Sequence, residues 1–155
     1  MIMPSLWIDR DRAAIDARLD RLRPDMQPLW GRMNASQMLA HLGDAMRMAL
    51  GELPVTRRNL PGPLGYAPVK RLLLHGLLAG IPFPKGAPAA PELMARSAED
   101  WGAEREALRG LVRRLLSTPA DYQWAEHFLF GRLSRGTWGR LGYKHFDHHL
   151  RQFGV

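Results

Sequence analysis

Two histidines near the end of the sequence, His145 and His149, have the spacing of a helical metal-binding pair. Residues four apart lie on one face of an α-helix, so both imidazoles project to the same side. Trp138, Leu141 and Phe153 share that arc of the helical wheel, which directs the pair toward the core. A buried imidazole without a partner costs about 1–3 kcal/mol, and one divalent ion satisfies two of them. The spacing therefore predicts a metal site.

A third ligand has to come from another helix, and His41 is the candidate. On its own helical wheel it lies close to Met38 and Ala45, so it also faces the core. Gln37 and Asp44 are one turn to either side and are expected to orient its ring as hydrogen-bond acceptors. Three neutral histidines with an open fourth position are typical of a catalytic metal site that activates water or accepts a thiolate.

Three other polar side chains are expected near this site. His148 lies at the edge of the arc defined by His145 and is expected at the rim. Gln152 lies within the arc, one turn after His149, and is expected beside the metal or the substrate. His127 follows an amphipathic aromatic segment and is a candidate for substrate contact, with metal ligation as a weaker alternative.

Composition limits the chemistry that these residues can perform. The 155 residues fit one domain, 1–155. The sequence has no cysteine, which excludes disulfides, thiolate metal sites and cysteine nucleophiles. The metal must therefore be held by imidazole, and any thiol must arrive as a cosubstrate.

The charge and hydropathy patterns argue against nucleic acid and membranes as partners. The net charge is +7, but the arginines are mostly interleaved with acids, as in residues 9–12, which is typical of solvated helix faces. The longest apolar stretch, 72–84, is too short for a membrane span, and the N-terminus lacks the apolar run of a signal peptide. We therefore expect a cytoplasmic protein that acts on a small-molecule substrate.

Helical periodicity dominates the sequence, and no segment alternates like a strand. This predicts an all-α fold. Helices are expected from Asp9 to Leu22, from Asn34 to Gly51 with Gln37 as capping-box partner, from Ser97 and Asp100 to before Pro119, and from Ser134 or Thr137 to about Phe153. A shorter helix is expected from Val69 to Leu78. Proline-rich connections are expected at 54–68 and 81–91, and the secondary structure of 120–133 is ambiguous. This order of helices and connections predicts an antiparallel four-helix bundle with an extra short helix.

The histidine pattern resembles that of the DinB/YfiT-like superfamily of metalloenzymes. The resemblance is carried by His41 in the second helix and by the terminal His145-x-x-x-His149-x-x-Gln152. One bacterial branch also has segments similar to 127–134 and 138–153, although it usually has proline where Phe128 stands here. The resemblance implies a four-helix bundle whose three histidines bind Zn, Ni or Fe.

Members of that superfamily include metal-dependent transferases that use low-molecular-weight thiols and a thiol-dependent maleylpyruvate isomerase. The resemblance therefore implies transfer or isomerisation with a small thiol whose pKa the metal lowers. Arg47, Arg57 and Arg58 lie close in sequence to the second helix and are expected to hold an anionic thiol cofactor, because guanidinium pairs bidentately with carboxylate.

Other functions are compatible with the same residues. A metal-dependent hydrolase would use Asp44 or Glu126 as general base. A non-catalytic binding or stress protein would use the histidines only to join the helices, since a histidine on an apolar face is often a hydrogen-bonded core residue. An apolar helix face in 68–80 is compatible with a homodimer.

Overall fold

The computed structural model describes residues 3–87, 89–94 and 96–155. Within these ranges the chain has five α-helices, two short 3-10 helices and no β-strand, which confirms the predicted all-α class. The α-helices are α1 (Asp9–Arg21), α2 (Ala35–Ala49), α3 (Ala67–Leu78), α4 (Trp101–Leu116) and α5 (Arg135–Gln152). The 3-10 helices are η1 (Gly62–Gly65) and η2 (Pro91–Leu93).

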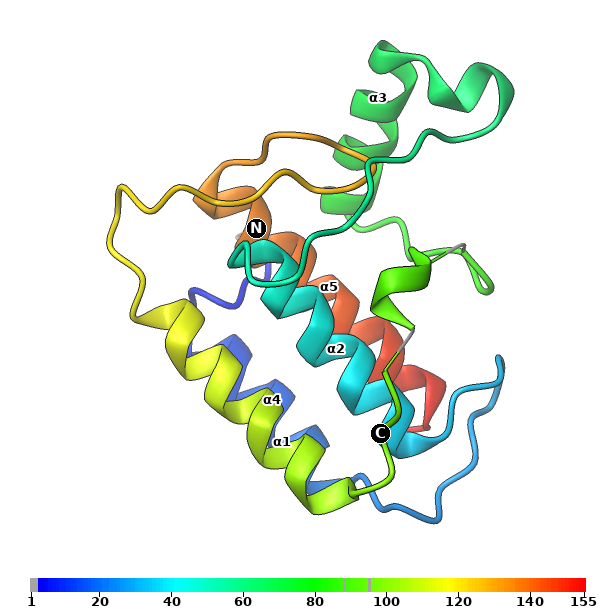
Figure 1. Ribbon diagram of the computed structural model, residues 1–155, viewed down its shortest axis with the longest axis vertical. Coiled ribbons are helices and arrows are strands. Elements are labelled where there is room, and N and C mark those ends of the chain that lie inside the picture. Colours follow the sequence, from blue (N-terminus) through cyan, green and yellow to red (C-terminus); the bar gives the residue numbers. More distant parts are fainter. Residues whose placement is uncertain (1–2, 88, 95) are drawn as a thin grey trace.

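Helices α1, α2, α4 and α5 share one apolar core, and their axes run roughly along one direction in Figure 1. Helix α2 packs against α4 and α5, and α1 packs against α5. The centre of this core is made by Leu39 and Leu42 of α2, Leu108 of α4 and Phe146 of α5, all almost completely buried. Because 12 of the 15 residues of α2 are buried, polar side chains on this helix have to find partners inside the protein.

The helix starts follow the capping residues of the sequence with one correction. Asn34 and Gln37 form the predicted capping box at the start of α2. Ser134, the first of the two predicted alternatives, caps α5 by accepting a hydrogen bond from the N–H of Thr137. Helix α4 starts later than expected, because Asp100 is its N-cap and Ser97 lies outside the helix.

Helix α3 stands apart from the other helices and projects beyond the ends of α2 and α5 in Figure 1. It begins at Ala67, two residues before the predicted start, with Pro68 in its first turn. Among the helices of the described ranges it contacts only α5 and η1, and it has no buried residue. Leu72 is 72% exposed, so the predicted apolar face exists, and its use in a dimer stays a prediction.

The connections contain little regular structure but have defined turns. The proline-rich segment 54–68 contains only η1 and the start of α3, and η2 begins at the end of 81–91. The ambiguous segment 120–133 contains a tight turn closed by two hydrogen bonds of 2.8 Å between the backbones of His127 and Gly131. None of the described helices combines the length and the apolar character that crossing a membrane requires.

Candidate metal centre

Helices α2 and α5 bring the three predicted ligands together. His41 extends from α2 and His145 and His149 extend from α5, and one ligand atom of each lies within 4.8 Å of the others. The Nε2 atom of His145 is 3.0 Å from Nε2 of His41 and 3.1 Å from Nε2 of His149. We call these three residues the histidine triad.

The outer nitrogens of two triad residues have partners that fix the position of the ring proton. Nδ1 of His41 is 3.1 Å from the carbonyl oxygen of Leu93, which can only accept, so this nitrogen carries the proton. Nδ1 of His149 is 2.8 Å from Oε1 of Gln152. The amide nitrogen of Gln152 donates to the carbonyl oxygen of Trp30 at 2.6 Å, which assigns its Oε1 as the acceptor for His149. Both rings therefore direct the lone pair of Nε2 toward the centre of the triad.

This arrangement has a hydrogen-bonding conflict that a cation resolves. Nε2 of a neutral His145 carries at most one proton, so it can donate to His41 or to His149 but not to both. In at least one of these two contacts, the lone pairs of two Nε2 atoms then face each other across about 3 Å. An ion with metal–nitrogen bonds of about 2.0–2.1 Å would hold tetrahedral ligands about 3.4 Å apart, close to the separations found here. The donor set therefore fits a divalent metal ion.

The electrostatic environment keeps the triad neutral at pH 7. Burial lowers the pKa of His41, although its hydrogen bond to Leu93 acts in the opposite direction. Burial lowers the pKa of His149 to about 3, with a contribution from the adjacent His41. Burial and the neighbouring imidazoles hold the pKa of His145 well below its ordinary value. Neutral imidazole is the form that binds a metal ion.

His41 obtains its hydrogen-bond acceptor from Leu93 instead of from the two residues expected on its own helix. Gln37 is exposed, and its side chain is used in the capping box with Asn34. Asp44 is buried, and its carboxylate pairs with arginines. The main-chain carbonyl of Leu93 takes the place predicted for these side chains.

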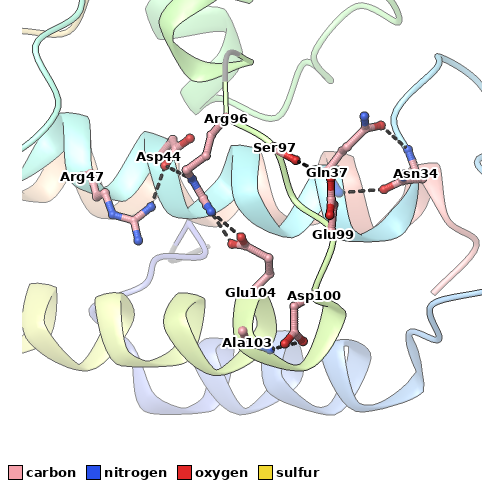
Figure 2. A network of polar contacts seen from close by, with 10 residues as sticks. All are labelled: Asn34, Gln37, Asp44, Arg47, Arg96, Ser97, Glu99, Asp100, Ala103 and Glu104. Atoms are coloured by element: carbon pink, nitrogen blue, oxygen red, sulfur yellow. Dashed lines mark hydrogen bonds and ion pairs between the residues drawn. The ribbon is translucent and has the colours of Figure 1, made fainter.

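An ion-pair network holds the segment that carries Leu93 against α2. Figure 2 shows Arg96 between α2 and α4, where it pairs with Asp44 on α2 and Glu104 on α4. Arg47 pairs with the same Asp44 at 2.6 Å. The side chain of Leu93 is buried, so this segment is fixed by both an apolar and an ionic anchor. Asp44 thus makes no hydrogen bond to His41 among the described residues, although its negative charge acts to raise the pKa of His41.

Aromatic side chains from two connections form the rim of the triad. The half-buried ring of His148 packs edge-on against Trp30 at 5.8 Å and Phe83 at 5.7 Å. Phe83 also lies edge-on to His145, at 6.3 Å. Lys85 places its ammonium group 4.5 Å from the centre of the Trp30 ring. His148 also packs edge-on against His149 at 5.0 Å, and neither Trp30 nor Phe83 is marked by a periodic pattern in the sequence.

The remaining predicted site residues lie outside the triad. His127 is buried in the tight turn of the 120–133 segment. The three arginines expected at an anionic cofactor each pair with a different carboxylate: Arg47 with Asp44, Arg57 with Glu126 and Arg58 with Glu92. Each of the three guanidinium groups is therefore already paired with an acidic side chain, and their role at a cofactor stays a prediction.

The fold and the triad define an all-helical protein with a candidate three-histidine metal centre between its second and last helices. Residues 4–154 match the family model described as "Protein of unknown function (DUF1569)", and the chain belongs to this family. It has no significant match among curated proteins or among solved structures.

Proposed function

We propose that this protein binds one divalent metal ion through its histidine triad and uses it with a small-molecule thiol in a transfer or isomerisation reaction. The observation that supports the proposal is the convergence of three Nε2 atoms, two of them held in the ligating form by Leu93 and Gln152. An ion held by three neutral imidazoles keeps an open position and, when bound, lowers the pKa of a thiol placed there.

The relationship to the DinB/YfiT-like superfamily is part of this proposal. It is supported by one ligand in α2 and two in α5, and by four helices that share a core. The Zn, Ni or Fe preference and the thiol chemistry both come from the resemblance. Because the chain has no cysteine, the thiol has to be supplied as a cosubstrate.

In a transfer of this class the thiol sulfur forms a bond to an electrophilic carbon of the substrate, and the bond from that carbon to the leaving group breaks. The thiol proton leaves with the leaving group or passes to solvent. In an isomerisation the thiol adds to the substrate and is released unchanged. The rim residues Trp30, Phe83 and His148 offer ring surfaces for an apolar substrate next to the triad.

Metal content tests the first half of the proposal. Untagged protein is expected to contain about one ion per chain after purification, and His145→Ala is expected to contain much less. Circular dichroism of both proteins checks that the variant is folded. Wild-type protein without stoichiometric metal would refute the metal centre and would favour the alternative in which the histidines only join the helices.

Thiol binding tests the second half. Protein loaded with Co²⁺ is titrated with 2-mercaptoethanol, and a sulfur-to-cobalt charge-transfer band is expected that saturates with thiol. Stoichiometric metal without this band would refute thiol chemistry and leave the metal centre intact. Substitution of Arg47, Arg57 and Arg58 by glutamine, with no change in the affinity for an anionic thiol such as mercaptosuccinate, would remove these arginines from the proposal.

Metal-dependent hydrolysis is less well supported by the geometry. The two candidate bases, Asp44 and Glu126, are paired with arginines. Among the described residues, neither carboxylate forms a hydrogen bond with a triad histidine. A hydrolase would have to separate one of them from its partners before it could accept a proton from water. Ester hydrolysis by the metal-loaded protein that is lost in Glu126→Gln would favour this alternative.

A further inference from the structure

A cavity of about 320 Å³ lies at the C-terminal end of α2, between the 51–57 and 125–128 segments. Its volume is within the range of small-molecule binding sites. None of the residues that line it belongs to the triad. Met48, which lines it, follows His41 by seven residues, or about 10 Å along the helix axis. The cavity is therefore separate from the metal centre.

His127 contributes an oriented hydrogen-bond donor to the wall of this cavity. Its side chain is buried, and Nδ1 accepts hydrogen bonds from the N–H groups of Leu129 at 3.1 Å and Phe130 at 3.3 Å. The proton of the neutral ring is therefore on Nε2, which has no hydrogen-bond partner among the residues that the structure describes. The ring stacks on Phe128 and Phe130, so the edge with Nε2 is the part it can present to the cavity.

Burial lowers the pKa of His127 to about 4, so the ring is neutral at pH 7 and keeps this single N–H. This N–H has no partner among the described residues and is not fully enclosed by protein atoms, so a ligand in the cavity can reach it. The cavity wall therefore offers one hydrogen-bond donor at this position.

Arg57 adds a positive charge at the edge of the cavity. It makes one hydrogen bond among the described residues, from Nη1 to Oε2 of Glu126 at 2.7 Å, so most of its N–H groups are available. Glu126 is 46% exposed and is also paired with Arg132 on the outside. Arg57 is therefore the cationic group that the cavity can offer to an anion.

We propose that the cavity binds a small carboxylate with an apolar body, which accepts the hydrogen bond of His127 and pairs with Arg57. The apolar part contacts Leu53, Val55 and Phe128, which belong to the apolar part of the wall. The site takes its ligand independently of the metal centre. Glu126 also lines the cavity, but its carboxylate is paired with both Arg57 and Arg132. The remaining N–H groups of Arg57 and the neutral donor of His127 favour a carboxylate over an uncharged compound of the same shape.

Phenylacetate is a suitable probe, and phenylacetamide is its uncharged isostere. A titration of the ¹⁵N-labelled protein followed by NMR is expected to show saturable shifts at the amides of Leu129 and Phe130, with a dissociation constant of about 1 mM or lower. Phenylacetamide is expected to bind about tenfold more weakly. The two probes are measured with metal-loaded and with EDTA-treated protein, and the affinities are expected to agree.

Three variants assign the contacts. His127→Asn keeps an acceptor for the turn at the position of Nδ1 but removes the Nε2 donor, and it is expected to weaken phenylacetate binding about tenfold. Arg57→Gln is expected to have a similar effect on phenylacetate and little on phenylacetamide. Ala125→Leu fills the cavity and is expected to abolish the shifts, while thermal unfolding checks that each variant is folded.

Several outcomes would overturn the proposal. They are the absence of saturable binding to wild-type protein, equal affinity for the two probes, shifts centred on the triad, and binding that Arg57→Gln and His127→Asn leave unchanged. Wild-type protein that binds phenylacetate but takes up no stoichiometric metal would contradict the proposed function and leave this site standing.

Discussion

Replacement of Gln152 by leucine tests whether this residue sets the ligating form of the triad. Gln152 is 4% exposed, accepts from Nδ1 of His149 and donates to the carbonyl oxygen of Trp30. Leucine has nearly the same volume and can do neither. The substitution leaves one buried donor and one buried acceptor unpaired, each costing about 1–3 kcal/mol.

We expect the leucine variant to lose about 2–4 kcal/mol of stability, since its apolar side chain offsets part of that cost. In a chain of this size the midpoint of thermal unfolding in excess EDTA then falls by about 5–15 °C. The proton of His149 is also free to move to Nε2, which removes a lone pair from the centre. Loss of such a partner typically lowers metal affinity about 10–100-fold.

Gln152→Glu is the matched control. Its carboxylate still accepts from His149 but cannot donate to Trp30, so we expect reduced stability with zinc affinity within about threefold of the wild type. Zinc affinity is measured by competition with a chelating dye, and the tautomer of His149 by ¹⁵N NMR of the ring nitrogens. If the leucine variant loses stability but binds zinc as tightly as the wild type, Gln152 has only a structural role and the reasoning is wrong.

Three other predictions follow from contacts around the site. Arg96→Ala is expected to weaken zinc binding about tenfold, because it releases the segment that carries the acceptor for His41. Arg47→Ala removes the other partner of Asp44 and is expected to leave zinc affinity unchanged. Metal-free protein is expected to lose stability in urea as the pH falls from 7 to 5, because His127 and His149 have pKa values of about 4 and about 3 when folded and take up protons near pH 6.5 only when unfolded. Each of the two residues lowers the free energy of unfolding by about 2 kcal/mol at pH 5, and an unchanged urea midpoint would contradict this. Gly31→Ala is expected to destabilise the protein by more than about 1 kcal/mol, since Gly31 has φ of 81° and an added Cβ would lie 2.5 Å from the amide nitrogen of Gln152. Gly110→Ala in the middle of α4 is expected to stabilise the protein and serves as the control in urea unfolding.

The triad was predictable because helical periodicity fixes which side chains face the core. His145 and His149 share an apolar arc, and His41 lies among buried methionines, so their inward direction follows from the spacing. The core helices were predictable for the same reason. Ser97 and Asp100 are both good N-cap residues three positions apart, and local preference does not choose between them.

The surroundings of the triad were not predictable from periodicity. The acceptor for His41 is the main-chain carbonyl of Leu93, and every residue type has such a carbonyl, so no side-chain pattern marks it. Trp30 and Phe83 lie in irregular connections, where their positions depend on how the chain crosses the helix ends. The orientation of the His127 ring depends on a turn that its own Nδ1 completes.

The sequence distance between the two helices that carry the triad has a consequence for how the protein is kept folded. His41 and His145 are 104 residues apart, so an ion bound by both would close a loop that contains most of the chain. In a chain-entropy model a covalent link across such a loop restricts the unfolded chain by about 4–5 kcal/mol. A protein without cysteine can have no disulfide of this kind, and the ion would serve as its cross-link. Resistance to proteolysis would then report metal occupancy directly, without any assay of the reaction.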